Sequence, residues 1–411
     1  MKSIAVIGAG AAGCFCAIEL KRRLPDARVT VYEAGRHPLA KVAVTGGGRC
    51  NFTNTFEHVG RLEEVYPRGA QVMKRALRVF SHEDIREWFR REGVPSVAQP
   101  DDCVFPCSQD AMQIVRTLER LMRQLGVELV CDRRIASISE LSEETIVVTA
   151  GGNSAATLRA LLPDEVGITD TVPSLFTFKI SDPGLRALTG TVVENASLSL
   201  AGTSFKSCGP LLLTDWGVSG PATLKLSSHA ARHLAANAWS ATLLVNWLAA
   251  GESEVRAELA ALAASNPQKQ VSTTHPAELT ERLWKHLISR AGLRGDIRWA
   301  EMGAKGTSRL VGVLTSDTYQ ISGRARFKEE FVTCGGVDLA GVNISTLESK
   351  SHPGLYFAGE VLDIDAVTGG FNLQAAWSTA MVVAGAIATN QENLPRVREP
   401  RPSGRRSQDG R

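Results

Sequence analysis

The strongest constraint on the fold is a glycine motif near the start of the chain. Ser3–Ile7 is a short, apolar, β-branched run of the kind that forms a buried parallel strand. It leads directly into GAGAAG at residues 8–13, and a helical apolar pattern follows and stops before Pro25. A second strand is predicted over Arg28–Tyr32, and Glu33 comes directly after it. Strand, glycine turn, helix, strand and acid together are the fingerprint of a dinucleotide-binding fold.

Each part of this fingerprint has a predicted role. Gly8 permits the tight turn, Gly10 lets the backbone approach a pyrophosphate, and Gly13 lets the helix pack closely on the strand. Glu33 is expected to accept a hydrogen bond from a ribose hydroxyl, and the helix N-terminus offers N–H groups to the phosphates. FAD and NAD share the fingerprint, so it does not choose between them. The predicted cofactor contacts in this part are Gly8, Ala9, Gly10, Ala11, Ala12, Gly13, Glu33 and Ala34.

A second glycine-rich segment, KVAVTGGGRCNFTN at residues 41–54, follows Glu33 after a short loop. Three consecutive glycines cannot fill a core, but they let backbone lie along an extended cofactor, with cationic side chains near its phosphates. A flexible surface loop is the alternative, and it leaves GRCN unexplained. The predicted contacts here are Lys41, Thr45, Gly46, Gly47, Gly48, Arg49, Cys50 and Asn51.

The C-terminal part repeats this chemistry in GLYFAGEVLDIDAVTGGFNLQ, residues 354–374. A strand, an acid, a Gly-Gly turn and a long apolar helix can close a flavin site, because the positive helix end faces the electron-rich edge of the ring. Val-Thr-Gly-Gly occurs at 44–47 and again at 367–370, so both chain ends are expected to reach one site. A purely structural last helix is the alternative. The predicted contacts are Gly359, Glu360, Asp363, Gly369, Gly370, Phe371, Asn372 and Leu373.

Three side chains in these segments are candidates for a catalytic role, namely Cys50, Asn51 and Asn372. Cys50 is the one thiol in a motif expected to approach the flavin. A structural cysteine is the simpler role for it.

The intervening sequence fits a flavin-binding domain. Helices are predicted over Ser81–Glu92, with Ser81 as N-cap, and over Asp110–Leu125, whose apolar residues lie on one side. Strands are predicted over Val127–Val130, Arg134–Ile138 and Thr145–Ala150. The backbone of Arg134–Ile138 would pair with adenine, and the strand that ends at Ala150 runs into a glycine turn. Ile135, Ala150 and Gly151 are therefore further predicted contacts.

Charge and cysteine usage limit the partners. The formal net charge is +3, but residues 394–411 carry six arginines against two acids, so the rest of the chain is about −1. Nothing in this overall charge suggests a nucleic-acid surface, so a nucleic-acid partner is not expected. The predicted partner is a small-molecule substrate. Residues 393–411 are predicted to be a disordered basic tail. Eight cysteines without a C-x-x-C pair predict reduced thiols in a cytoplasmic protein.

Two other site types are not expected. No stretch approaches 18 uninterrupted apolar residues, so no transmembrane helix and no membrane partner are predicted. His229 and His233 have the i, i+4 spacing of a metal pair but no evident third ligand, so no metal site is predicted.

Taken together, these motifs resemble the YhiN-like, or BaiN-like, bacterial flavoproteins, described as NAD(P)/FAD-dependent oxidoreductases or aminoacetone-oxidase-family FAD-binding enzymes. The resemblance implies FAD as cofactor and spans nearly the whole chain. The chain departs from the family pattern after Gly152, where a Ser-Tyr-Pro and glycine-rich segment typically follows. The matching segments are VIGAGAAG (6–13), TGGGRCNFTN (45–54), VFPCSQDA (104–111), GPLLLTDWGVSGPATLKLSS (209–228), VTCGGVDL (332–339), STLESK (345–350) and GLYFAGEVLDIDAVTGGFNLQAAWS (354–378).

The predicted fold class is α/β, with a Rossmann-like FAD-binding domain built from both chain ends and an inserted β-barrel-like domain that carries a small helical insertion. Alternating apolar runs in Phe176–Trp247 and Val311–Val337, such as FTFKI and ATLLVNW, indicate the β part. The predicted boundaries are 1–175 and 341–392 for the FAD domain, 176–245 and 306–340 for the β domain, and 246–305 for the helical insertion.

The expected function is an FAD-dependent oxidoreductase that transfers a hydride between flavin N5 and a small organic substrate or NAD(P)H. No second dinucleotide fingerprint occurs in the sequence, so NAD(P)H would visit the flavin transiently. Two alternatives stay open: an FAD-binding redox sensor or RNA-associated flavoprotein without turnover, and an amine oxidase that uses O₂.

Overall fold

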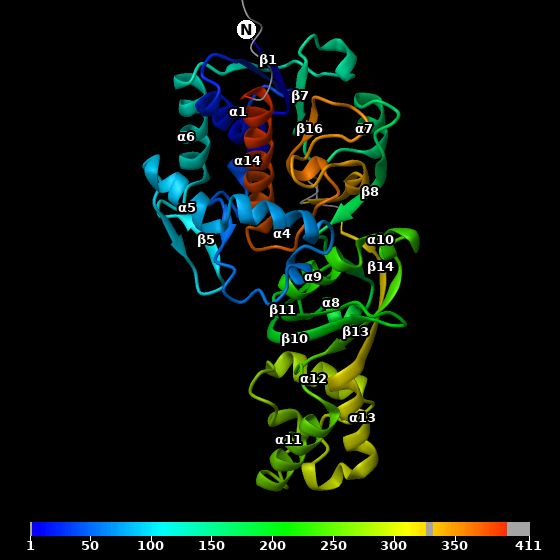
Figure 1. Ribbon diagram of the computed structural model, residues 1–411. Coiled ribbons are helices and arrows are strands. Elements are labelled where there is room, and N and C mark those ends of the chain that lie inside the picture. Colours follow the sequence, from blue (N-terminus) through cyan, green and yellow to red (C-terminus); the bar gives the residue numbers. More distant parts are fainter. Residues whose placement is uncertain (1, 326–331, 393–411) are drawn as a thin grey trace, which may run out of the picture.

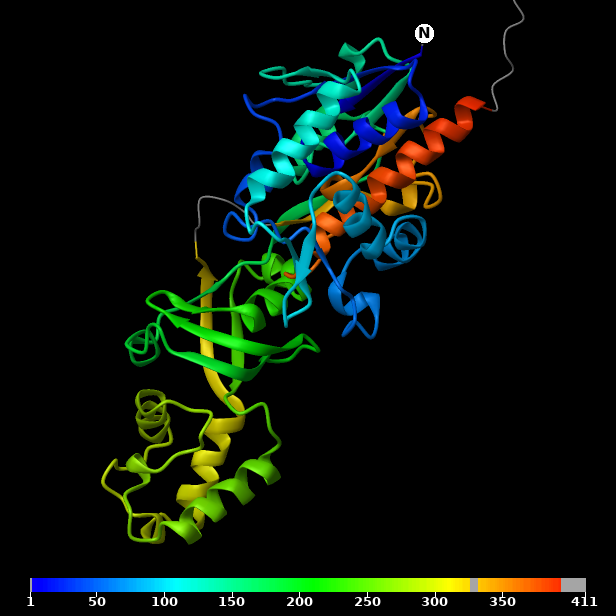
Figure 2. The same ribbon diagram turned by 90° about the vertical axis from the view of Figure 1, so that its left-hand side faces the viewer.

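The computed structural model describes residues 2–325 and 332–392, which form three parts in a row (Figures 1 and 2). The sheet domain is built around a parallel sheet, the barrel domain follows it, and the helical insertion lies at the far end of the barrel. The predicted tail at 393–411 lies outside the described residues.

The sheet domain is built from both chain ends, as predicted. Its five strands run in the order β16-β7-β1-β2-β6, and every neighbouring pair is parallel. β16, from the C-terminal part, pairs with β7 from the N-terminal part, with Leu355 opposite Ile146. The strands are β1 (Ser3–Ile7), β2 (Arg28–Tyr32), β6 (Glu128–Val130), β7 (Thr145–Val148) and β16 (Leu355–Phe357).

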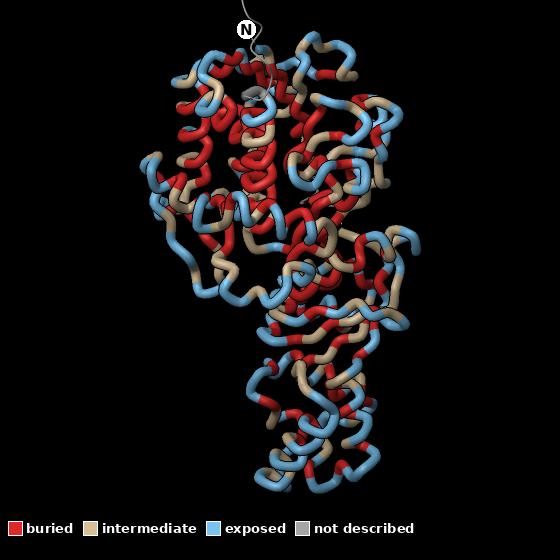
Figure 3. The backbone as a smooth tube through the Cα atoms, in the orientation of Figure 1, coloured by how far each residue is buried: buried red, intermediate tan, exposed pale blue. Residues whose placement is uncertain are grey.

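Three helices lie side by side against this sheet: α1 (Ala11–Arg23), α6 (Ala111–Gln124) and α14 (Phe371–Glu392) (Figure 1). Phe15 of α1 and Trp377 of α14 meet with ring centroids 5.5 Å apart. By length and composition α14 is apolar enough to cross a membrane, yet 72% of its apolar window is buried inside the protein. Figure 3 shows this helix almost entirely as buried, which identifies it as the core helix of the domain.

Smaller elements surround this core. The predicted helix after Ser81 is confirmed, because Ser81 and Asp84 form a reciprocal capping box; Asp110 likewise caps α6. The remaining elements are α2 (Ala40–Val44), α3 (Leu62–Val65), α4 (Ala70–Val79), α5 (His82–Arg91), α7 (Ala155–Leu161), a three-stranded sheet of β3 (Thr53–Asn54), β5 (Cys103–Pro106) and β4 (Ser96–Ala98), and the 3₁₀ turns η4 (Leu339–Gly341) and η5 (Gly359–Val361).

The strand predicted over Arg134–Ile138 is wrong. This segment is a loop that ends in the 3₁₀ turn η1 (Ile138–Glu140). Ser137 caps that turn, and the Glu140 carboxylate accepts from the Ser137 N–H at 3.2 Å. The alternation of apolar and polar residues therefore comes from a capped turn and not from a strand.

The barrel domain is a closed six-stranded barrel in the order β10-β11-β12-β9-β14-β13, and all its pairs are antiparallel. The runs FTFKI and ATLLVNW contain β9 and β13, as predicted. The strands are β9 (Phe178–Ile180), β10 (Val192–Leu200), β11 (Lys206–Thr214), β12 (Gly217–Ser219), β13 (Ala241–Asn246) and β14 (Asp317–Arg324), and the helices are α8 (Pro183–Arg186), α9 (Pro221–His229) and α10 (Ala231–Ala236).

Two segments predicted as part of the β domain differ. β15 (Val332–Val337) pairs with β8 (Ile168–Ser174) outside the barrel. There a Cβ at Gly336 would overlap the Val361 backbone of the sheet domain. The start of the predicted run Val311–Val337 belongs to helix α13 (Gly303–Ser316), because the buried Leu310, Val311 and Leu314 follow helical spacing.

The helical insertion contains α11 (Glu252–Ser265), α12 (Glu281–Arg290) and α13, with the 3₁₀ turns η2 (Val271–Thr273) and η3 (Trp299–Glu301). Its helices therefore continue past the boundary predicted at residue 305. The chain leaves the barrel for the insertion after β13 and enters the barrel again at the start of β14.

A buried carboxylate joins the insertion to the barrel. Asp317, 3% exposed, accepts hydrogen bonds from Arg290 Nε at 2.7 Å, from the Tyr319 hydroxyl at 2.7 Å and from Trp247 Nε1 at 3.2 Å. These donors come from α12, from β14 and from the segment after β13. One acid therefore fixes both connections at once.

We predict that Asp317→Ala destabilises the protein by about 2–4 kcal/mol, because the buried Trp247 and Tyr319 donors lose this acceptor and Arg290 keeps only Asp182 as an acidic partner among the described residues. Chemical denaturation followed by circular dichroism measures the change. The control is Asp296→Ala, whose ion pair with Arg294 has side chains 65% and 78% exposed, and which should cost about 1 kcal/mol or less. Equal losses in both variants would contradict the assigned role of Asp317.

Candidate cofactor site

The glycine turn at residues 8–13 holds β1, α1 and β7 in close contact. Gly8 has a φ of 104°, and a Cβ there would lie 2.5 Å from the Thr149 carbonyl oxygen. A Cβ at Gly13 would overlap the Gly8 carbonyl oxygen. The Thr149 hydroxyl lies 2.8 Å from this same oxygen and donates to it. Thr149 was missed by the sequence reasoning, although it stands in the last strand-like residues before the Gly151 turn.

Other glycines of the predicted site face open space. No atom lies within 4 Å of a Cβ built on Gly10, Gly47 or Gly48. Gly46, Gly47 and Gly48 also have positive φ values of 61°, 68° and 81°, which explains why three glycines follow one another. These backbone segments fit an extended dinucleotide, because a bound group could approach them without meeting a side chain.

Glu33 holds the turn from the side of β2. Its carboxylate accepts from the Ala9 N–H and the Gly35 N–H, each at 2.8 Å. The Glu33 carbonyl accepts from the Arg133 N–H at 2.9 Å, which brings the loop with the buried Ile135 beside this acid. The predicted adenine contact at Ile135 therefore lies near Glu33, but on a loop and not on the predicted strand.

Residues just after the first Val-Thr-Gly-Gly segment contact the second one. Asn54 Nδ2 donates to the Gly369 carbonyl at 3.0 Å. The Thr53 hydroxyl donates to Gln374 Oε1 at 2.5 Å, and Trp377 Nε1 donates to the Phe52 carbonyl at 2.9 Å. Residues from 52–54 therefore line the turn at which α14 begins.

The two predicted acids have different surroundings. Glu360 accepts from the Thr333 N–H at 2.9 Å and lies 3.5 Å from Lys41 Nζ, beside the Ala150–Gly151 turn. Asp363 instead accepts from Arg232 of α10, at 2.6 and 2.7 Å, and so faces the barrel domain. Glu360 is thus the acid that the fold brings to the other predicted cofactor residues.

Lys41 and Arg49, the two cationic side chains predicted to contact the phosphates, have different partners from each other. Lys41 pairs with Glu360 across the gap between the two chain ends. The guanidinium of Arg49 lies over the Phe105 ring, 4.4 Å from its centroid, in a cation–π contact. Gly359 packs on α1, since a Cβ there would lie 2.8 Å from the Ala12 Cβ.

Of the three catalytic candidates, Cys50 is buried, and Asn51 and Asn372 bind backbone groups. Burial raises the pKa of the Cys50 thiol to about 12, so it carries its proton at neutral pH. Asn372 binds the Ala366 backbone with its whole amide, accepting from the N–H at 2.9 Å and donating to the carbonyl at 3.0 Å. Asn51 Oδ1 accepts from the Val104 N–H at 3.2 Å.

No metal centre accompanies these groups in residues 2–325 and 332–392, where no cluster of three His, Cys, Asp or Glu side chains is placed to hold an ion. His229 and His233 do not lie on one helix, because α9 ends at His229 and α10 begins at Ala231.

Three kinds of comparison bear on this site. The model of the family described as "HI0933-like protein Rossmann domain" matches residues 2–386. The ribosomal RNA dihydrouridine synthase of Escherichia coli (strain K12) is 28% identical over 92% of this chain and 96% of its own length. The 3-dehydro-bile acid delta(4,6)-reductase of Clostridium scindens is 24% identical over 94% of this chain and 99% of its own.

A solved structure similar to this fold is the 3-ketosteroid delta1-dehydrogenase of Sterolibacterium denitrificans, with 11% identity, a TM-score of 0.48, and coverage of 95% of this chain and 100% of that one. A likeness this distant adds nothing on function. The family match spans both halves of the glycine site, the barrel and the insertion. The chain therefore belongs to the HI0933-like family, and it is an FAD-dependent oxidoreductase with a Rossmann domain.

Proposed function

We propose that this protein reduces a C=C bond conjugated to a carbonyl group and that NAD(P)H supplies the electrons. The observation that carries this proposal is the reaction shared by the names of the relatives. Dihydrouridine is uridine with its ring C=C bond saturated, and a delta(4,6) system beside a 3-dehydro carbon is conjugated to a carbonyl. An RNA base and a bile acid have little else in common.

Such a bond suits hydride chemistry. The carbonyl withdraws electrons, so the β-carbon accepts hydride and the α-carbon then takes a proton, while NAD(P)H is oxidised to NAD(P)⁺. Bound FAD supplies the two-electron relay between the nicotinamide and the alkene. The chain carries one dinucleotide fingerprint, which supports a nicotinamide that visits the flavin and leaves.

The chain's own residues would hold the reacting groups. The first N–H groups of α14 have no acceptors within the helix and form its positive end. Asn372 and the Tyr66 hydroxyl, which donates to the Phe371 carbonyl at 2.9 Å, keep this helix start in place. Cys50 is a poor proton donor because of its raised pKa, so we assign the α-carbon proton to another group or to water.

The proposal is tested by anaerobic stopped-flow mixing of the FAD-loaded protein with NADH and with NADPH. We expect one nicotinamide to bleach the flavin and a conjugated enone to restore its colour. The acceptor panel contains a 3-oxo-delta(4,6) steroid, a uridine-containing ribosomal RNA fragment and an isolated alkene as control. Bleaching by small amines with peroxide formed on re-aeration would point to an amine oxidase, and no bleaching at all would point to a redox sensor.

We predict that Gly10→Ala folds normally but binds FAD about tenfold or more weakly, a loss of about 1.4 kcal/mol. Its φ of −82° suits alanine, and the added methyl would enter the space that the cofactor is expected to fill. Gly312→Ala is the matched control, because that glycine also has open space but lies in α13. Thermal melts and FAD titration separate the two properties; unchanged FAD affinity in Gly10→Ala would remove the pyrophosphate assignment.

We also predict that Cys50 resists alkylation in the native protein at neutral pH, because it is fully buried and its pKa is raised to about 12. Cys107 and Cys208 are exposed and should react first. Iodoacetamide labelling with peptide mass spectrometry measures the order, and rapid labelling of Cys50 would show that its surroundings open.

A further inference from the structure

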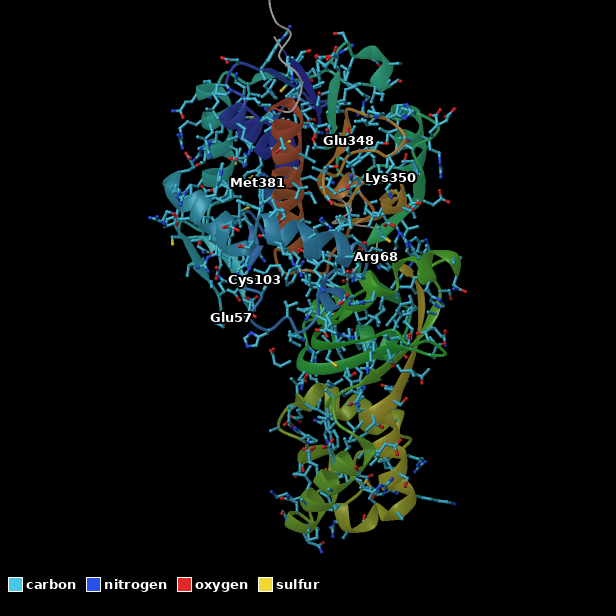
Figure 4. The ribbon with its side chains drawn as sticks, viewed as in Figure 1. Glu57, Arg68, Cys103, Glu348, Lys350 and Met381 are labelled. Carbon is cyan, nitrogen blue, oxygen red and sulfur yellow. The ribbon has the colours of Figure 1, made fainter. Side chains whose placement is uncertain are left out.

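Arg68 joins the sheet domain to the barrel domain from an almost buried position (Figure 4). Its Nε donates to Asp365 Oδ1 at 2.6 Å, and a second guanidinium nitrogen binds Asp365 Oδ2. The remaining nitrogen donates to the Ser228 carbonyl, at the end of α9 in the barrel domain, at 2.7 Å. The guanidinium therefore binds partners in both domains at once.

Asp365 completes the junction. Its side chain is 1% exposed, and Oδ2 also accepts from the Ser174 hydroxyl at 2.9 Å. Ser174 is the last residue of β8, where the chain leaves for the barrel. Four segments that are distant in sequence thus meet at one carboxylate and one guanidinium.

The junction leads directly to the predicted flavin turn. Asp365 precedes Ala366, whose N–H and carbonyl are both bound by the Asn372 amide at the start of α14. The Val367 N–H donates to the Val65 carbonyl at 2.9 Å, and Asn54 holds the Gly369 carbonyl. The turn at residues 366–370 is therefore fixed at both ends, and Asp365 directly precedes it on the side of the barrel domain.

Backbone contacts add to this arrangement. Residues 68 and 365 form an antiparallel bridge, and a Cβ at Gly69 would overlap the Ile364 side chain. An apolar contact could fill the same volume and give similar stability, because desolvation offsets most of the gain from a buried ion pair. What a bidentate arginine adds is direction, since its planar fork fixes the carboxylate in one orientation.

We propose that Arg68 is a positioning residue. Through its pair with Asp365, the position of the barrel domain determines how the turn at 366–370 is held beside the flavin. The proposal rests on the proposed function only in placing the flavin beside this turn. The second ion pair of the junction, between Arg232 and Asp363, has an arginine side chain 46% exposed and constrains less.

The test compares four variants of the FAD-loaded protein. Arg68→Met removes the guanidinium and leaves a buried carboxylate, whereas Arg68→Met combined with Asp365→Asn leaves no buried charge. Arg68→Lys keeps the charge without the fork. Arg159→Gln is the control, because its pair with Asp170 is exposed. Measured quantities are the melting temperature, the FAD dissociation constant, the visible flavin spectrum and the rate of flavin reduction.

We expect Arg68→Met to lower the melting temperature and the double variant to regain most of this loss. In both variants we expect the FAD affinity or the rate of flavin reduction to fall about 10- to 100-fold. Arg68→Lys should regain stability with only partial recovery of the flavin properties, and Arg159→Gln should match the parent. If FAD affinity, spectrum and reduction rate recover together with the melting temperature in the double variant, the pair is structural only and the proposal is overturned.

These readouts do not depend on the alkene substrate. FAD affinity and the visible spectrum are measured without any acceptor, and flavin reduction can be driven by dithionite. A protein that reduces no conjugated alkene but shows the expected flavin changes would refute the proposed function and leave the positioning role supported.

Discussion

The first turn of α1 lies against the ends of β1 and β7 at a distance that leaves no room for a Cβ at Gly13. This contact brings the open backbone of Gly10 to the end of the parallel sheet, where the helix N-terminus can receive a phosphate. Thr149 and Glu33 hold the turn from its two sides by hydrogen bonds to its backbone. Because this site is formed mainly by backbone, only a few positions, such as Gly8 and Gly13, exclude a side chain, and most other positions can vary.

Long insertions are compatible with this core because the two strands that frame them are neighbours. β7 and β16 pair directly, although the barrel domain and the helical insertion lie between them in sequence. Each junction is then held by a buried carboxylate with an arginine: Asp365 with Arg68 at the sheet domain, and Asp317 with Arg290 at the helical insertion. Substrate specificity can thus vary in the inserted parts while the dinucleotide core keeps its geometry.

Local signals made much of this predictable from the sequence. Gly8, Gly10 and Gly13 between two strands specify a turn by their own backbone needs. The repeated Val-Thr-Gly-Gly predicted that both chain ends reach one site, and residues 52–54, just after the first repeat, do contact the second at Gly369. The loop at Arg134–Ile138 and helix α13 were misjudged because short apolar runs fit both periods, and capping and tertiary contacts decide between them. Arg68 and Asp365 form a contact between positions far apart in the chain, and no local pattern marks such a pair.

The use of both chain ends has a consequence for biosynthesis. β16 and α14 follow the barrel and the insertion in sequence, yet they supply an edge strand and the core helix of the sheet domain and half of the glycine site. On the ribosome, β7 emerges early, and its partner β16 arrives only after the barrel and the insertion have been made. The inserted domains can fold during that interval, so FAD can be enclosed only after β16 and α14 have also been made. Cofactor binding would then require that the barrel domain and the helical insertion have been synthesised first.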